Sequence, residues 1–226
     1  MNNKPLKPIL FNTDMTRAVL DGRKTSTRRI VKAPVLYNCT EPPSRIFRDG
    51  DLFQFQWNTG KTIGGFSIKP PYLPGDILYV RETWRVLRAH RYDANADIVF
   101  KAGGVWSRVC FANGGTDSID RDDYDRFIEK WYPNGNWRPS IHMPKEAARL
   151  FLRVTDVRVE RLHKIMNDPP GPNNQIVREG CKYGCDFIAI WESTVQKQDR
   201  AHYGWDANPY VWVIEFERCE KPEVDT

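Results

Sequence analysis

The chain has 226 residues, of which 40% are hydrophobic and 28% charged. This length is typical of one domain, and the apolar content suffices for a core, which excludes disordered and fibrous classes. The 34 Lys and Arg against 29 Asp and Glu give a net charge of +5, a weak argument for a polyanionic partner. No apolar run reaches the ~20 residues that span a bilayer, and residues 1–6 carry no signal-peptide core. We therefore expect one cytoplasmic domain over residues 1–226, with no membrane association.

The first elements are a strand, a helix and a basic turn. Ile9–Phe11 is a short apolar run of strand type. Asn12–Asp14 are N-cap residue types that open a short helix, and Gly22 ends it because glycine accepts a left-handed backbone. The basic stretch Arg23–Arg29 follows and leads into a predicted strand.

The middle of the chain alternates loops with strands. Residues 33–75 are rich in Pro and Gly and predict loops with short strands such as Leu52–Trp57. Ile77–Val80 is a predicted buried strand after a Pro-Gly-Asp turn. Ala94–Asn136 has the character of an insertion, with an amphipathic helix around Tyr124. We expect this insertion to pack outside the main fold.

The last third predicts two strands separated by helices. Phe151–Arg161 is a long strand whose apolar phase shifts near its middle. Gln175–Glu179 forms one helical turn, and Phe187–Val195 forms a second amphipathic helix. Val211–Phe216 is a core strand. Scattered strands with short helices indicate an α+β fold, a small β-barrel with short helices packed around it.

The five cysteines form no paired spacing that indicates disulfides. Cys181 and Cys185 are four residues apart, and His163 could join them as a third metal ligand. Zinc sites usually show a second close pair. We therefore expect neither a metal site nor a cofactor.

Four motifs resemble the ASCH domain family of the PUA-like superfamily, in its longer, phage-associated branch. They are Leu20-Asp21-Gly22-Arg23-Lys24-Thr25-Ser26-Thr27-Arg28, Tyr72-Leu73-Pro74-Gly75-Asp76 with Val80-Arg81-Glu82-Thr83-Trp84, Trp137-Arg138-Pro139 through Pro144-Lys145-Glu146-Ala147, and Trp205-Asp206-Ala207-Asn208-Pro209. The resemblance implies a PUA-like β-barrel with a basic cleft that binds RNA or modified nucleosides.

The resemblance also implies a possible activity. Compact bacterial members are amidohydrolases that remove the acetyl group of N4-acetylcytidine with a Lys, a Thr and a Glu, and others are described as ribonucleases. In this chain the three positions fall on Lys24, Thr27 and Glu179. Lys24 is the expected base, Thr27 the nucleophile or water-positioning group, and Glu179 an accessory acid.

The substrate's polar groups are expected to contact a set of residues around a cleft between the basic turn and the strand that ends at residue 81. These residues are Arg23, Arg28, Arg29, Arg81, Glu82 and Trp84. Neighbouring arginines disfavour a charged lysine, so we expect a lowered pKa for Lys24. A tryptophan such as Trp84 can stack on a base.

Each assignment has a structural alternative. The basic stretch reads equally as a solvated strand edge, Glu179 as a solvated acid at a helix end, and Trp84 as a core residue. The alternative function is a non-catalytic module for RNA or single-stranded nucleic acid. We also expect Lys24 and Arg28 to be exposed, so that truncating either costs well under ~1 kcal/mol of stability.

Overall fold

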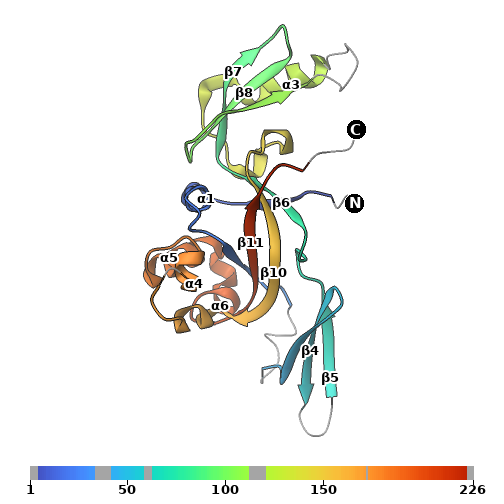
Figure 1. Cartoon of the computed structure of the whole chain (residues 1–226), viewed down its shortest axis with the longest axis vertical. Coiled ribbons are helices and arrows are strands. Elements are labelled where there is room, and N and C mark those ends of the chain that lie inside the picture. The colour runs from blue at the N-terminus through green and yellow to red at the C-terminus, as the bar shows by residue number, and fades with distance from the viewer. Residues whose placement is uncertain (1–4, 34–41, 59–62, 112–120, 172, 223–226) are drawn as a thin grey trace. The chain divides into compact units, whose positions relative to one another are not determined.

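The computed structural model describes residues 5–33, 42–58, 63–111, 121–171 and 173–222. Within these residues the chain forms eleven strands in three sheets, with several short helices (Figure 1). The predicted α+β class is confirmed. The described strands do not close into a barrel, so the PUA-like barrel stays a prediction.

The chain contacts divide the molecule into two compact units. Unit 1 comprises Met1–Gly22, Ile77–Arg153 and Arg218–Thr226, and unit 2 comprises Arg23–Asp76 and Val154–Glu217. The expected insertion, residues 94–136, lies wholly in unit 1, and its residues 112–120 lie outside the described part of the chain.

Unit 1 begins with the predicted strand and helix. β1 (Lys7–Leu10) pairs in parallel with β6 (Ile77–Arg81), and the start of β10 (Phe151–Arg161) pairs antiparallel with β6. α1 (Thr13–Leu20) is capped by Asn12, whose side chain accepts a hydrogen bond from the Met15 amide at 2.8 Å. Gly22 follows with φ +74°, as the expected helix end requires.

A second sheet of unit 1 contains strands that were not predicted. β7 (Trp84–His90), β8 (Asn95–Phe100) and β9 (Ser107–Cys110) form an antiparallel sheet. α3 (Arg121–Trp131) is the predicted amphipathic helix, and its Phe127 ring stacks on Trp84 at 6.0 Å. The segment expected as an insertion therefore supplies two strands and a helix to the core of unit 1.

Unit 2 packs short helices beside a sheet. β2 (Ser26–Ile30) pairs antiparallel with β11 (Tyr210–Cys219). α4 (Gln175–Arg178), α5 (Gly184–Thr194) and α6 (Arg200–Tyr203) gather beside these strands (Figure 1). Apolar residues of α5, β11 and the 3-10 helix at Leu162–Asn167 share one core. The predicted helices and the strand β11 are confirmed.

A three-stranded sheet completes unit 2. β3 (Arg45–Asp49), β4 (Leu52–Asn58) and β5 (Ile63–Ile68) are antiparallel neighbours. The Phe55 ring stacks on Phe66 at 5.0 Å and lies edge-on to Tyr210 at 6.2 Å. The predicted strand at 52–57 is confirmed as β4.

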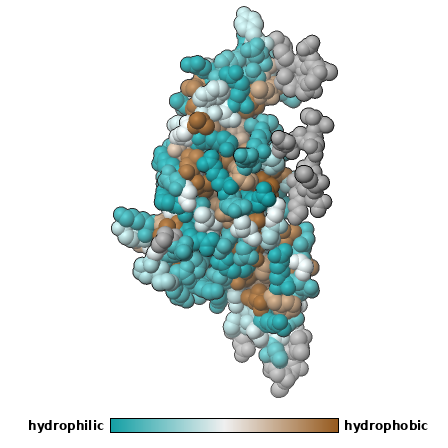
Figure 2. Space-filling model, viewed as in Figure 1, coloured by the Kyte–Doolittle hydropathy of each residue, from teal (hydrophilic) through white to brown (hydrophobic). Residues whose placement is uncertain are grey.

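The surface in view is mostly hydrophilic, with apolar residues in small groups between polar ones (Figure 2). None of the helices in the described part of the chain is long and apolar enough to cross a membrane.

Candidate functional site: a buried Lys–Glu–Arg cluster

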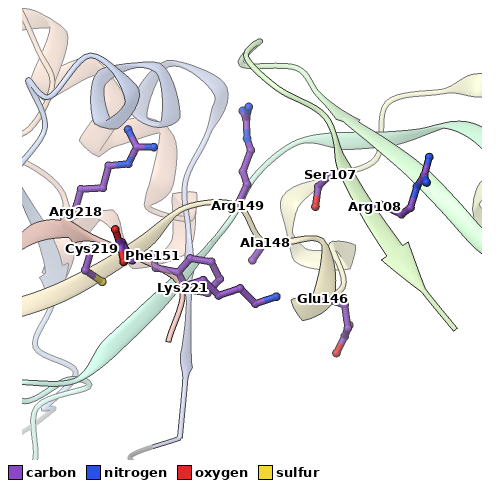
Figure 3. Close-up of a pocket in the computed structure, with 10 residues that line it drawn as sticks. Ser107, Arg108, Glu146, Ala148, Arg149, Phe151, Arg218, Cys219 and Lys221 are labelled. Atoms are coloured by element: carbon purple, nitrogen blue, oxygen red, sulfur yellow. The ribbon is translucent and has the colours of Figure 1, made fainter. Parts of the chain in front are cut away.

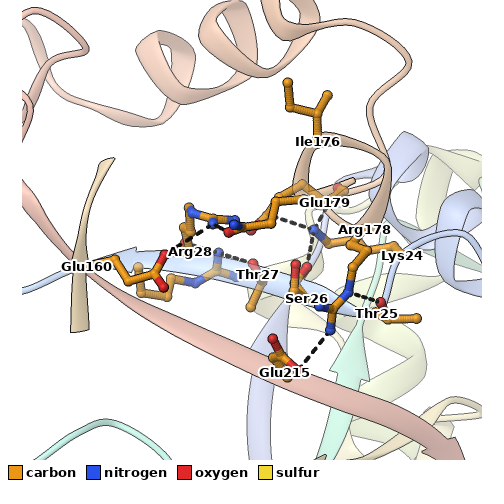
Figure 4. A network of polar contacts seen from close by, with 12 residues as sticks. Lys24, Thr25, Ser26, Thr27, Arg28, Glu160, Ile176, Arg178, Glu179 and Glu215 are labelled. Atoms are coloured by element: carbon orange, nitrogen blue, oxygen red, sulfur yellow. Dashed lines mark hydrogen bonds and ion pairs between the residues drawn. The ribbon is translucent and has the colours of Figure 1, made fainter. Parts of the chain in front are cut away.

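The basic turn is held in unit 2 by backbone hydrogen bonds. The Thr25 amide donates to the Arg178 carbonyl, and the Phe216 amide donates to the Thr25 carbonyl, each at 2.9 Å. These bonds place the chain ahead of β2 between the end of α4 and β11. The Lys24 and Arg28 side chains consequently point toward the end of α4 (Figure 4).

Lys24 is fully enclosed and makes a complete set of hydrogen bonds. Its Nζ donates to Glu179 Oε2 at 2.9 Å, to the Glu179 carbonyl at 2.8 Å and to the Ser26 carbonyl at 2.8 Å. The Lys24 side chain has no exposed surface. An ammonium group has three N–H donors, and three acceptors surround this one.

Burial and the Glu179 carboxylate shift the pKa of Lys24 in opposite directions. Removal from water lowers the pKa of Lys24 below its ordinary value, the charge of Glu179 opposes that shift, and Arg29 adds to it. The expected direction is confirmed, but its main cause is burial, with the neighbouring arginine a smaller contributor.

Glu179 joins Lys24 to Arg28. Arg28 Nη1 donates to Glu179 Oε1 at 2.9 Å, so each carboxylate oxygen binds one cation. Arg28 Nη2 donates to Gln175 Oε1 and lies 3.7 Å from Glu160 Oε2. We call Lys24, Arg28, Glu160 and Glu179 the buried cluster.

Two expectations about exposure are therefore wrong. Lys24 and Arg28 are 2% and 4% exposed, and Glu179, also read as a solvated helix-end acid, is 5% exposed. The physical reason is mutual compensation, because opposite charges with satisfied hydrogen bonds can be buried together. Truncation of Lys24 accordingly removes an internal contact.

Thr27 does not join the other two members of the expected trio. Along β2, Ser26 and Arg28 alternate with Thr27 and Arg29, so the pairs lie on opposite faces of the strand. Thr27 Oγ1 accepts a hydrogen bond from Arg29 Nη1 at 2.8 Å, and among the described residues it bonds to neither Lys24 nor Glu179. Burial lowers the pKa of Arg29.

An outer ring of charges surrounds the buried cluster, and it was not predicted. Arg158 donates to Glu160 Oε1 at 2.8 Å and to Glu215 Oε1 at 2.6 Å. Arg178 Nη2 lies 2.9 Å from Glu215 Oε2, and Lys164 Nζ donates to Glu160 Oε1 at 3.0 Å. The sequence signal for these charges was the presence of acidic residues, Glu160 and Glu215, within the otherwise apolar strands β10 and β11.

The buried cluster retains unused hydrogen-bonding capacity. Ser26 Oγ, Arg28 Nε and Glu160 Oε2 are buried and have no hydrogen-bond partner among the described residues. Native proteins rarely leave such atoms unpaired. All three atoms are enclosed by the protein.

Comparisons with models of protein families, with curated protein sequences and with solved structures found no match.

The remaining predicted contacts divide between the two units. Arg23, in unit 2, is exposed, and its Nη1 donates to the Gly180 carbonyl at 3.3 Å. Arg81, in unit 1, donates through Nε to the Met143 carbonyl at 2.9 Å and through Nη2 to the Ile141 carbonyl. Arg81 therefore holds a loop of its own unit.

Glu82 and Trp84 are core residues of unit 1, and their expected contact with substrate stays a prediction. Both are 0% exposed. Glu82 forms two hydrogen bonds with Arg149, and burial raises its pKa against the opposing effect of that arginine. The Trp84 ring contacts the rings of Phe127 and Trp131. Both residues follow closely after the strand β6, and their side chains lie in the core of unit 1.

The buried cluster combines two cations, Lys24 and Arg28, with two carboxylates, Glu160 and Glu179. No group of three or more metal-ligating side chains occurs within the described residues. Lys24, whose pKa is lowered by burial, donates to Glu179, and Arg28 Nε has no hydrogen-bond partner among the described residues.

Proposed function

We propose that this chain is an ASCH-like, PUA-like protein that binds RNA or a modified nucleoside and hydrolyses an amide of the N4-acetylcytidine type. The observation that carries the proposal is the 2.9 Å contact between Lys24 Nζ and Glu179 Oε2. The resemblance assigned these two residues to one reaction although they are 155 positions apart in sequence. Their contact in a buried setting supports that assignment.

In the proposed reaction, water replaces the Thr27 hydroxyl as the nucleophile. Neutral Lys24 accepts a proton from the water as its oxygen attacks the acetyl carbon. Arg28 donates to the resulting oxyanion. The Lys24 ammonium then returns the proton to the N4 nitrogen as the carbon–nitrogen bond breaks, which releases acetate and cytidine. Glu179 positions Lys24, and Thr27 serves as an accessory polar group.

The experiment is an assay of cytidine release from N4-acetylcytidine. Lys24→Met keeps most of the side-chain volume and removes the proton acceptor, so the rate should fall by 10²–10⁴-fold. Lys32→Met is the matched control, because Lys32 is exposed and lies in the same basic region. Circular dichroism verifies that each variant is folded. Equal rates for the two variants would oppose the proposal.

The second candidate is the non-catalytic binding module. The saturated hydrogen bonds of Lys24 favour it, because three acceptors stabilise the ammonium form. Fluorescence anisotropy with single-stranded and duplex RNA at physiological salt tests this reading. Binding of the single strand without any release of cytidine would favour the second candidate over the hydrolase.

A further inference from the structure

A pocket of about 700 Å³ lies in unit 1, but its basic side chains do not form a common binding point. Figure 3 shows that these side chains point in different directions along the wall. They are Arg108, Arg149, Arg218 and Lys221. Unit 2 offers a different kind of site, the open edge of its three-stranded sheet.

β5 is an outer strand of that sheet, beside β4 (Figure 1). Within the described residues, β4 is its only strand neighbour, and no backbone hydrogen bond joins β5 to any other element. Gly64, Gly65 and Ser67 are exposed. Such an edge presents a row of unpaired N–H and C=O groups to any strand that approaches it.

The backbone groups of Gly65 point toward the open side of β5. Gln56 of β4 lies opposite Gly65, and its carbonyl accepts a hydrogen bond from the Ser44 amide at 2.8 Å. Ser44 directly precedes β3, so this carbonyl faces β3 and not β5. Hydrogen-bonded and non-hydrogen-bonded pairs alternate along an antiparallel ladder. Gly65 and, two residues later, Ser67 therefore direct their N–H and C=O groups away from β4.

β5 also lacks the features that keep sheet edges from pairing. Its sequence, Ile-Gly-Gly-Phe-Ser-Ile, contains neither a charged residue nor proline, and its register with β4 has no bulge. By contrast, arginine occurs in β3, at the opposite edge of the same sheet, and in the outer strands β7 and β9 of unit 1. Charged side chains, proline and bulges are the usual means of protecting an edge. β5 has none of them.

We propose that β5 pairs antiparallel with β5 of a second copy of this chain. A two-fold axis at Phe66 places Phe66 opposite its own copy, Gly65 opposite Ser67, and Gly64 opposite Ile68. The two faces of the sheet match in this register, because Gly64, Phe66 and Ile68 share the apolar face and Gly65 and Ser67 share the polar face. The proposal does not depend on the function proposed for the buried cluster.

The chemistry of β5 favours a second copy as its partner. The Phe66 ring stacks on Phe55 at 5.0 Å and on Trp57 at 5.7 Å, and pairing at Phe66 continues this aromatic row across the axis. No charge of β5 meets its own copy across the axis, as Arg45 or Arg48 would in a pairing through β3. A pair of six-residue strands is smaller than a permanent interface, so the dimer should be reversible and concentration-dependent.

Sedimentation velocity of the full chain, at concentrations from about 1 μM to about 1 mM, tests the pairing. Ser67→Pro removes the outward N–H of residue 67, and Ser67→Lys adds a charge to the edge. Ser67→Ala is the matched control, because it loses the same hydroxyl, which donates to Gln54 Oε1 at 2.6 Å, and keeps the N–H. We expect the wild type and Ser67→Ala to dimerise, and the other two variants to associate about tenfold more weakly. Circular dichroism verifies that each variant is folded.

Hydrogen exchange at low and high protein concentration locates the interface. The amides of residues 63–68 should exchange more slowly at the high concentration, and those of β3 should not change. The proposal is overturned if the wild type stays monomeric over the whole range, if Ser67→Pro and Ser67→Lys dimerise as tightly as Ser67→Ala, or if concentration-dependent protection appears elsewhere and not in β5.

Discussion

Replacing Lys24 with alanine tests whether the buried cluster stabilises unit 2. The substitution removes the ammonium that donates to Glu179 Oε2, to the Glu179 carbonyl and to the Ser26 carbonyl. It also leaves a cavity where the aliphatic chain of Lys24 was enclosed. Glu179 keeps its contact with Arg28 Nη1 at 2.9 Å, so its charge is still partly compensated.

The expected cost follows from these contacts. Breaking a buried ion pair by removing one partner costs about 3–5 kcal/mol. Since Arg28 continues to pair with Glu179, we expect the lower end, about 3 kcal/mol of the free energy of unfolding. Lys164→Ala is the matched control, because the Lys164 side chain is 57% exposed although it also pairs with a buried glutamate. Its cost should stay below about 1 kcal/mol.

Urea unfolding followed by tryptophan fluorescence measures both variants, with the midpoint and the slope fitted separately. A Lys24→Ala variant that is within 1 kcal/mol of the wild type, or no less stable than Lys164→Ala, would refute this reasoning. Such a result would mean that the cluster contributes little to folding.

Three further predictions concern the core, the acid range and Thr27. Trp212→Ala should cost about 3–5 kcal/mol in the same urea assay, because Trp212 is buried and packs edge-on against Phe53 at 5.1 Å; a cost below 1 kcal/mol would contradict its place in the core. Burial disfavours ionised Glu215, but hydrogen bonds from Arg178 and Arg158 outweigh burial and lower its pKa. The unfolded chain then binds more protons, so the free energy of unfolding should fall as the pH drops from about 5 through the folded pKa of Glu215. Glu215→Gln should make this pH dependence less steep than in the wild type. An unchanged pH dependence in urea unfolding between pH 3 and 6 would contradict the prediction. Thr27→Ala should lower cytidine release by less than tenfold, because Thr27 bonds to Arg29 on the opposite face of β2 from Arg28; a loss as large as that of Lys24→Met would restore Thr27 as the nucleophile.

Local signals were sufficient to predict several elements. The cap at Asn12 and the glycine at position 22 define α1, and Gly180, with φ +88°, ends the turn after α4. The apolar run of β11 is long enough to predict a core strand. These elements depend on neighbouring residues, so a single sequence contains the information.

Other elements depend on partners distant in the chain. Apolar and polar residues alternate poorly along β8, and β8 forms a strand because it pairs with both β7 and β9. The burial of Lys24 requires a glutamate that follows 155 residues later, so a basic stretch read alone predicts exposure. Trp84 was assigned to a ligand by its motif, whereas α3 covers it in the core.

The pH dependence of cytidine release by the full chain tests the central claim most directly. If Lys24 is the proton acceptor, the rate should rise with pH as Lys24 loses its proton, with a midpoint below the ordinary lysine pKa of 10.5. The lowered midpoint follows from the burial of Lys24, and Lys24→Met should abolish this limb of the profile. Absence of cytidine release from the wild type, or a rate that rises identically in Lys24→Met, would contradict the assignment of Lys24 as the base.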